Sequence, residues 1–412
     1  MLSSTTARLN RNTPFFDWYL MPEAYSAPLV RQAIVEFGLR KGETVLDPFC
    51  GTGTSLLAAR DVGCNAVGIE VNPFLCFASR VKTHNWQDAP SLRSQAVRIL
   101  AEARVRLDKA CVDDLIDDSN LPEMPRRERW IARRVACKIV TLRDCIEKNS
   151  TEASRPFFLL ALAAILRGAS NMKLSPHAFG SREVKQDAPV LVMFEAKLDK
   201  MLADVACAEH EGRFSGTQVH VNQDDIRDPG NMSSTLLPAQ LAVCSPPYLN
   251  NLDYTMQTRL ELFFLGFVSD MEELKSLRKQ MMICDAKATY RDIEDWRRVE
   301  QIQSVMDIAA QIDEKLEDKG WGWDYGRMTR QYFGGLLRAM SSISRMLAPG
   351  APLVMILGES AHAGILVSVP DIAAELGQLA GYTQPEVREL RTRRSSSHNI
   401  KLKESAVVLR KG

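Results

Sequence analysis

The 412-residue chain lacks the features that define several classes of protein. Its nine cysteines are an odd number without a Cys-x-x-Cys pair, so we expect reduced thiols rather than disulfides or zinc. Its six histidines show no metal-ligand spacing, and we expect no metal site. The longest apolar run, residues 156–166, is too short to cross a bilayer, and no signal peptide is visible. These absences predict a cytoplasmic protein without a membrane segment.

The sequence also lacks an overall excess of charge, since its formal net charge is +1. A protein that binds nucleic acid must then concentrate cations where phosphates lie. Two segments do so: residues 126–143, which we expect to form one helix, and residues 388–399, which end in a serine-rich loop. The first can equally be the solvated face of an amphipathic helix, and the second can serve solubility alone. The candidate phosphate contacts are Arg133, Arg134, Arg391, Arg393 and Arg394.

A glycine-rich turn follows the short apolar segment Val45-Leu46-Asp47, and a helix of small residues comes next. Gly51 and Gly53 have no β-carbon, so the backbone of this turn can approach a ligand closely. Asp47, at the tip of the predicted strand, can accept hydrogen bonds from an ammonium group or from ordered water. A Gly-x-Gly sequence alone is also compatible with an ordinary turn.

A second predicted strand, residues 66–69, ends in Glu70, about 20 residues after the glycines. A carboxylate at this position holds the ribose hydroxyls in dinucleotide-type folds. Glu70 can also cap the helix that starts after Asn72-Pro73, and the two roles can coexist. Nicotinamide cofactors use Gly-x-Gly-x-x-Gly, whose third glycine is missing here. The pattern therefore favours S-adenosylmethionine as the nucleoside cofactor.

The turn Ser245-Pro246-Pro247-Tyr248 follows the apolar run of residues 241–243. An amino group conjugated to a ring is a poor nucleophile, and two acceptors aimed at its N–H bonds make it more tetrahedral. Ser245 Oγ and the Pro246 carbonyl can be these acceptors, because the two prolines fix the backbone rigidly. Tyr248 offers a flat face on which an extruded base can stack. Alone, the sequence could be only a rigid proline turn.

Together, the two turns resemble the S-adenosylmethionine-dependent amino-methyltransferases, which methylate exocyclic amines of DNA bases. The resemblance covers residues 13–82 and 217–412. It implies that an aromatic N-terminal segment packs over the methionine end of the cofactor, and that Asp225 binds the adenine amino group. The implied cofactor-binding residues are Phe16, Tyr19, Asp47, Pro48, Phe49, Gly51, Gly53, Thr54, Glu70, Asn72 and Asp225.

The resemblance implies an α/β fold with a doubly wound, mostly parallel, Rossmann-like sheet. Residues 1–82 and 217–412 would form the catalytic core. Residues 83–216 read as a largely helical insertion and a candidate for target recognition, and residues 270–325 as a second insertion. In the cytosine enzymes with this catalytic sequence the catalytic motif commonly comes first, whereas here the cofactor motif does. Either insertion is therefore a candidate to read DNA.

The expected activity is site-specific methylation of cytosine N4 in double-stranded DNA, with the base flipped out of the helix. The expected partners are DNA and the proteins of a restriction or defence system, and the location is cytoplasmic, on the nucleoid when the protein acts. Three alternatives stay open: methylation of adenine N6, methylation of a guanine amino group in RNA or tRNA, and a non-catalytic cofactor-binding subunit of a restriction complex.

Overall fold

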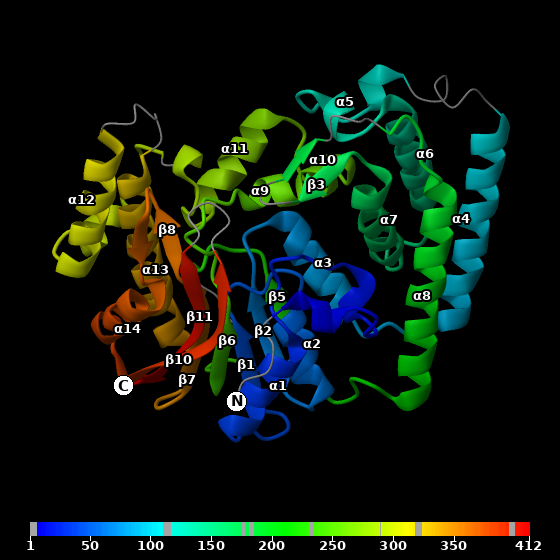
Figure 1. The fold of residues 1–412 in the computed structure, drawn as a ribbon. Coiled ribbons are helices and arrows are strands. Elements are labelled where there is room, and N and C mark those ends of the chain that lie inside the picture. The colour runs from blue at the N-terminus through cyan, green and yellow to red at the C-terminus, as the bar shows by residue number, and fades with distance from the viewer. Residues whose placement is uncertain are drawn as a thin grey trace.

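The computed structural model describes residues 6–109, 117–174, 178–180, 185–230, 235–288, 290–317, 324–394 and 400–412. Its centre is a seven-stranded sheet in the order β10-β11-β7-β6-β1-β2-β5 (Figure 1). The strands are β1 (Thr44–Asp47), β2 (Asn65–Ile69), β5 (Val219–Asn222), β6 (Leu241–Cys244), β7 (Pro352–Gly358), β10 (Tyr382–Arg394) and β11 (Lys401–Lys411).

The strands from β7 to β5 are mutually parallel, and the β10–β11 hairpin joins the β7 edge in antiparallel fashion. The chain first builds outward from β1 through β2 to β5, and then returns to place β6 on the other side of β1. The order of the strands therefore reverses between β1 and β6, and ligands bind at the carboxyl ends of strands beside such a reversal. The prediction of a doubly wound, mostly parallel α/β sheet is confirmed.

The sheet separates two apolar clusters, because alternate residues of each strand point to opposite faces. Val45 and Val243 face the first cluster, whereas Leu46 and Ala242 face the second. Helices α1 (Ala27–Glu36), α2 (Thr54–Asp61) and α3 (Pro73–Thr83) cover the first face. Helices α12 (Gln303–Glu317), α13 (Tyr325–Met346) and α14 (Val369–Leu379) cover the second.

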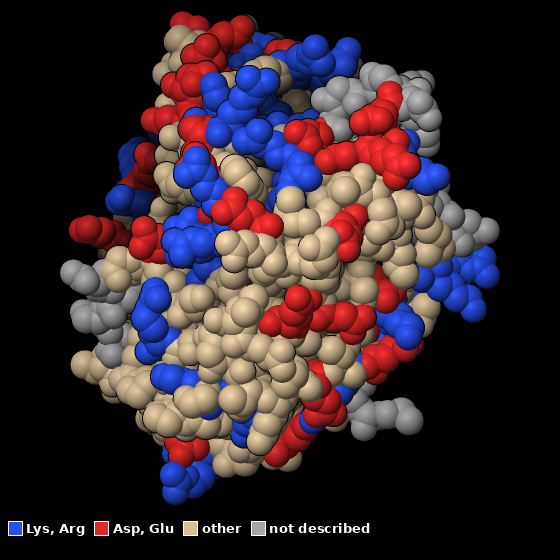
Figure 2. All heavy atoms as spheres, turned by 90° about the vertical axis from the view of Figure 1, so that its left-hand side faces the viewer, with Lys and Arg blue, Asp and Glu red and all other residues tan. Residues whose placement is uncertain are grey.

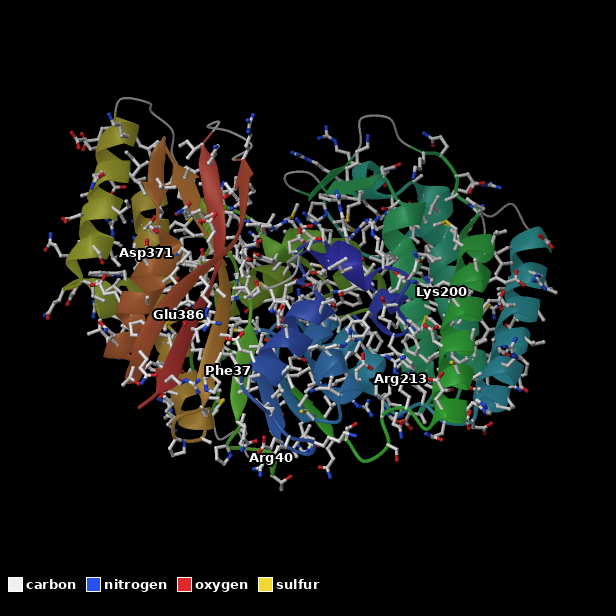
Figure 3. All side chains as sticks on the ribbon, turned by 60° about the horizontal axis from the view of Figure 1, so that its bottom comes forward. Phe37, Arg40, Lys200, Arg213, Asp371 and Glu386 are labelled. Atoms are coloured by element: carbon white, nitrogen blue, oxygen red, sulfur yellow. The ribbon has the colours of Figure 1, made fainter. Side chains whose placement is uncertain are left out.

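The long helices of the predicted insertion 83–216 stand side by side at one end of the molecule (Figure 1). Their buried side chains belong to the first apolar cluster, and the Phe157 ring meets Trp18 edge to face at 5.4 Å. Lys200 also pairs with Asp17, on the side of the molecule seen in Figure 3. The elements are α4 (Ala89–Lys109), η4 (Asp118–Asn120), α5 (Arg127–Trp130), α6 (Arg133–Asn149), α7 (Arg155–Ala169), β3 (Met172–Leu174), β4 (Ala178–Gly180) and α8 (Val190–Glu211).

The prediction of one helix over residues 126–143 is wrong. The structure has two helices, α5 and α6, because Ile131 and Ala132 adopt extended backbone conformations between them. The break lets Trp130 and Ile131 both turn into the apolar cluster, where Ile131 is fully buried. Burial of these two side chains thus outweighs the local helical pattern.

Short helices lie above the carboxyl ends of the parallel strands (Figure 1). They are α9 (Tyr254–Gln257), α10 (Arg259–Phe264) and α11 (Met271–Gln280), and the 3₁₀ turns η5 (Ala286–Ala288) and η6 (Asp295–Val299) follow them. The remaining elements are η1 (Ala7–Asn10) and η2 (Phe16–Trp18) near the N-terminus, and the hairpin of β8 (Ser360–His362) and β9 (Ile365–Val367). Among all the described helices, none is both long and apolar enough to cross a membrane.

Gly334 of α13 allows η6 to pack directly on the helix, since a β-carbon there would lie 1.9 Å from the Asp295 carbonyl oxygen. We expect Gly334→Ala to lower the thermal unfolding midpoint, because overpacking costs about 1–3 kcal/mol and outweighs a gain of about 1 kcal/mol in helix propensity. Gly168→Ala is the matched control, since its β-carbon would meet only the flexible end of Met193. Equal midpoints for both variants, measured by calorimetry, would contradict this packing.

Candidate active site

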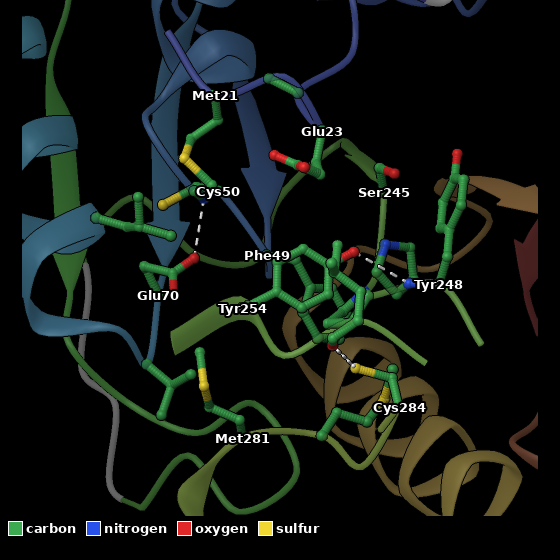
Figure 4. Close-up of a pocket in the computed structure, with 18 of the residues that line it drawn as sticks. Met21, Glu23, Phe49, Cys50, Glu70, Ser245, Tyr248, Tyr254, Met281 and Cys284 are labelled. Atoms are coloured by element: carbon green, nitrogen blue, oxygen red, sulfur yellow. Dashed lines mark hydrogen bonds between the residues drawn. The ribbon is translucent and has the colours of Figure 1, made fainter. Parts of the chain in front are cut away.

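One cavity of about 300 Å³ opens at the carboxyl ends of β1, β2, β5 and β6. The glycine turn lines one end of it and the Ser-Pro-Pro-Tyr turn lines the other, so two motifs about 190 residues apart in sequence share one space (Figure 4). Among the residues that the structure describes, no group of three His, Cys, Asp or Glu side chains could hold a metal ion.

The glycine turn is tied to the end of β2 by Glu70. The two oxygens of its carboxylate accept hydrogen bonds from the Gly51 amide at 3.0 Å and the Asn72 amide at 2.8 Å. Gly51 and Gly53 both adopt positive φ, and a β-carbon on Gly53 would lie 2.6 Å from Ser79 Oγ. Burial raises the pKa of Glu70 to about 7. The Glu70 side chain therefore lies at the cavity wall, and it forms no ion pair with any residue that the structure describes.

Asp47 supports the turn from behind and does not line the cavity. Its carboxylate accepts from the Tyr25 hydroxyl at 2.9 Å, the Phe49 amide at 3.0 Å and the Ser55 hydroxyl. The Tyr25 hydroxyl also lies 3.2 Å from the Val243 carbonyl on β6. Burial raises the pKa of Asp47 to about 6. Asp47 thus joins the ends of β1 and β6, and its contact with a ligand ammonium group stays a prediction.

The Ser-Pro-Pro-Tyr turn leaves the end of β6, and all four of its residues lie on the cavity wall. The Tyr248 amide donates to the Tyr254 hydroxyl at 3.4 Å, and the Tyr248 hydroxyl donates to Glu404 at 2.8 Å. Ser245 and Tyr248 lie next to each other in Figure 4. Hydrogen bonds therefore hold the turn at the backbone amide and at the side-chain hydroxyl of Tyr248.

Asp225, which follows β5, lies on the cavity wall beneath a buried arginine. Both oxygens of Asp225 accept hydrogen bonds from Arg227, the shortest at 2.8 Å from Nη2. Arg227 also donates to Asp295 of η6 at 2.8 Å, and a third contact reaches the Gln280 carbonyl. One guanidinium thus connects the cofactor end of the cavity with the segment 270–325.

The predicted cofactor residues divide into two groups. Those on the cavity wall are Pro48, Phe49, Gly51, Thr54, Glu70 and Asp225, and those behind it are Phe16, Tyr19, Asp47, Gly53 and Asn72. The second group has structural contacts: Tyr19 donates to Glu261 at 2.7 Å, and Asn72 caps α3 by accepting from the amides of Phe74 and Leu75.

Glu23 is a cavity residue that the sequence did not indicate. Its Oε2 atom is buried without a hydrogen-bond partner among the described residues, and Figure 4 shows the side chain between Cys50 and Ser245. Burial raises its pKa. Tyr25, Arg278 and Glu404 also line the cavity and were not expected. These residues carry no local motif, and only the fold brings them to the two turns.

The predicted nucleic-acid contacts have different surroundings. Arg133 donates to Asp118 at 2.8 Å and Arg134 to Asp187 at 3.0 Å, so both are already paired. Arg391 lines the cavity, and Arg393 donates to the Glu359 carbonyl at 2.9 Å. Arg394 is exposed at the end of β10, and the serine-rich loop 395–399 lies outside the described residues. Figure 2 views the molecule from the side where α12 and α14 lie in Figure 1. Charges of both signs cover this side, and the lysine and arginine side chains gather mainly toward the top.

Comparison with known proteins gives sequence matches along most of the chain. The family model for N6 and N4 methylases, described as DNA methylase, matches residues 19–80. The Type II methyltransferase M.BsoBI from Geobacillus stearothermophilus is 21% identical over 441 residues, covering 98% of this chain and 85% of that protein. The Type II methyltransferase M.AvaI from Anabaena variabilis is 25% identical over 426 residues, covering 94% of this chain and 83% of that protein.

Solved structures give only a weak likeness. The rRNA methyltransferase aviRa from Streptomyces viridochromogenes aligns with a TM-score of 0.31 at 9% identity, covering 97% of this chain and 91% of that one. This likeness carries no weight, and the fold rests on the strand order and directions given above.

The DNA methylase match lies on the segment that builds the glycine turn and Glu70, which makes S-adenosyl-L-methionine the cofactor. The cavity, the order of the strands and the two motifs agree with this match. The similarity of the chain to the DNA amino-methyltransferases, which its motifs predict, is confirmed by these matches.

Proposed function

We propose that this protein is a site-specific DNA methyltransferase that transfers a methyl group from S-adenosyl-L-methionine to N4 of cytosine. The observation that carries the proposal is the shared cavity, which brings the cofactor turn and the Ser-Pro-Pro-Tyr turn together. The similarity to Type II methyltransferases supports a role in restriction and modification. We accordingly propose double-stranded DNA and a cognate restriction system as its partners.

The lining of the cavity fits the charge of the cofactor. Glu23, Glu70 and Asp225 place carboxyl groups on its wall, and Glu23 Oε2 is buried and lacks a partner among the described residues. S-adenosyl-L-methionine has a positive sulfonium and a positive ammonium group, which such a wall stabilises. We assign Glu70 to the ribose hydroxyls and Asp225 to the adenine amino group. Arg227 donates two hydrogen bonds to Asp225 Oδ2 and so holds this carboxylate in place at the cavity wall.

The chemistry requires little beyond positioning. When bound, the cofactor supplies a methyl group on a sulfonium, which is already activated for transfer. Ser245 Oγ and the Pro246 carbonyl accept hydrogen bonds from the two N–H groups of the target amine and direct its lone pair toward the cofactor end of the cavity. As the nitrogen gains the methyl group it would lose one proton to water, and the demethylated cofactor would leave as a neutral thioether. Tyr248 stacks on the base, which must leave the duplex to enter the cavity. Cys244 is fully buried behind this turn, where it cannot act as a nucleophile toward a base.

The choice of cytosine follows from the serine before Pro-Pro-Tyr, since aspartate or asparagine tends to accompany adenine in the similar enzymes. Both bases present an amino group, and Ser245 can accept from either. Adenine N6 methylation is therefore the second candidate, and it uses the same cavity and the same acceptors. Methylation of RNA and a non-catalytic role are further outcomes that the experiments below distinguish.

The first prediction concerns cofactor affinity and pH. The pKa of Glu70 is about 7, so this carboxyl group is mostly protonated at pH 6 and ionised at pH 8. A cationic ligand favours the ionised form, so binding should release protons, and affinity should rise about tenfold from pH 6 to pH 8. Calorimetry in buffers of different ionisation enthalpy measures both effects.

Glu70→Gln should weaken binding and abolish this pH dependence. Glu43→Gln is the matched control, because Glu43 lies at the opposite end of β1 and pairs with Arg40 at the surface. Wild-type protein that binds neither the cofactor nor its demethylated product would contradict the methyltransferase assignment.

The second prediction concerns the methylated base. DNA incubated with enzyme and labelled cofactor should yield labelled N4-methylcytosine in nucleoside mass spectrometry. Ser245→Ala should lower turnover by about 100-fold and leave cofactor affinity unchanged, since it removes an acceptor that acts on the target amine only. Label found only in N6-methyladenine would reassign the base, and label found only in RNA would reassign the substrate. Binding without any turnover would favour the non-catalytic role.

The third prediction concerns phosphate contacts. Arg394 is exposed and forms no ion pair among the described residues, so we propose that it contacts a DNA phosphate. Arg394→Ala should weaken binding to all DNA sequences equally. It should also reduce the slope of the logarithm of the binding constant against the logarithm of the salt concentration by about one unit. The pair Arg133→Ala and Arg134→Ala should flatten it less, because their carboxylate partners already neutralise them. If the Arg133 and Arg134 substitutions reduce the salt dependence more than Arg394→Ala does, α6 contacts the DNA phosphates instead.

A further inference from the structure

Three residues on neighbouring strands form a row beneath Tyr248. Gly358 of β7 is directly opposite Glu404 of β11, and Glu404 is directly opposite Arg391 of β10. A β-carbon on Gly358 would lie 3.1 Å from a ring carbon of Tyr248, so the ring rests on the bare backbone at this point. The Gly358 backbone therefore lies close to the Tyr248 ring, and a side chain at this position would displace it. Tyr248 also lines the cavity.

Glu404 fixes the other end of the tyrosine. Its Oε1 atom accepts the Tyr248 hydroxyl proton at 2.8 Å, and its Oε2 atom accepts from Arg391 Nε. The Glu404 side chain is 6% exposed, whereas that of Arg391 is 40% exposed. A buried carboxylate needs such partners, because an unpaired charge would be costly. The arginine holds the carboxylate, and the carboxylate holds the tyrosine.

This contact also determines the direction of the hydrogen bonds in the catalytic turn. The Ser245 side chain lies beside Tyr248 at the cavity (Figure 4). A phenol has one proton, and the carboxylate of Glu404 can only accept, so the Tyr248 proton points to Glu404. The phenol oxygen can then only accept, so a hydrogen bond between Tyr248 and Ser245 requires the Ser245 hydroxyl to donate. The lone pairs of Ser245 Oγ remain free for the target amine, which requires an acceptor.

We propose that Glu404, held by Arg391, is a positioning residue for methyl transfer: it fixes the Tyr248 ring on Gly358 and orients Ser245 as a hydrogen-bond acceptor. The inference rests on the proposed function, and it gives Arg391 a role inside the site in place of the predicted phosphate contact. Neither residue touches the reacting atoms. Their effect passes through Tyr248 and Ser245.

The test combines single and double variants of the full chain, with turnover on DNA and cofactor affinity measured for each. Glu404→Gln should lower kcat about 10- to 100-fold with cofactor affinity unchanged, because the base and the acceptor are misplaced. Tyr248→Phe should have a similar effect, since it removes the hydroxyl through which Glu404 acts. The double variant should be no slower than the slower single variant. Glu389→Gln is the control, because Glu389 lies on the same hairpin and pairs with Lys403 at the surface.

Two results would overturn the proposal: a normal kcat for Glu404→Gln, or effects of Glu404→Gln and Tyr248→Phe that multiply in the double variant. Multiplying effects would show that Glu404 supports the fold independently of the phenol. If Glu404→Gln does not fold, Glu404→Asp replaces it, since it keeps the charge and withdraws the carboxylate from Tyr248. A wild-type protein without turnover would instead contradict the proposed function, so the two failures are distinguishable.

Discussion

The buried carboxylate of Asp47 is the constraint on which the site depends. It accepts from Tyr25, Ser55 and the Phe49 amide, and Tyr25 also reaches the Val243 carbonyl on the neighbouring strand. These contacts hold the ends of β1 and β6 together, where the two motifs leave the sheet. Because burial raises its pKa to about 6, Asp47 binds protons more tightly in the folded chain than in the unfolded one. Stability is therefore lost as the pH rises from about 3.8 to about 6, and hydrogen bonding to the carboxylate limits the loss.

The sequence predicted the parts of the site that depend on local pattern. Apolar runs ending in Gly51, Glu70 and Ser245 placed these residues at strand ends, and parallel pairing brings such ends together. It could not predict Glu23 or Glu404, because no motif surrounds them and only tertiary structure brings them to the cavity. The prediction of one helix over residues 126–143 was wrong for a related reason. Its periodicity was right for each half, but burial of Trp130 and Ile131 required a break between α5 and α6.

Charge was the least informative signal, because a sequence shows cations but not their partners. Arg133, Arg134 and Arg391 read alike in the sequence, yet the first two hold carboxylates of loops in the helical segment and the third holds Glu404 within the site. One cationic segment thus contained surface ion pairs, and the other contained a residue that holds Glu404 at the cavity wall. Burial separates these cases, since the carboxylate that Arg391 holds is almost completely inaccessible.

The guanidinium of Arg227 connects two parts of the molecule that the chain keeps apart. It holds Asp225 at the cofactor end of the cavity and Asp295 in the segment that covers α13. A displacement of that segment on DNA would change the hydrogen bonds of Asp225. Thermodynamic linkage makes such coupling reciprocal: if DNA changes the affinity for the cofactor by some factor, the cofactor changes the affinity for DNA by the same factor. Through Arg227, binding of DNA would then change the affinity for the cofactor, and binding of the cofactor would change the affinity for DNA.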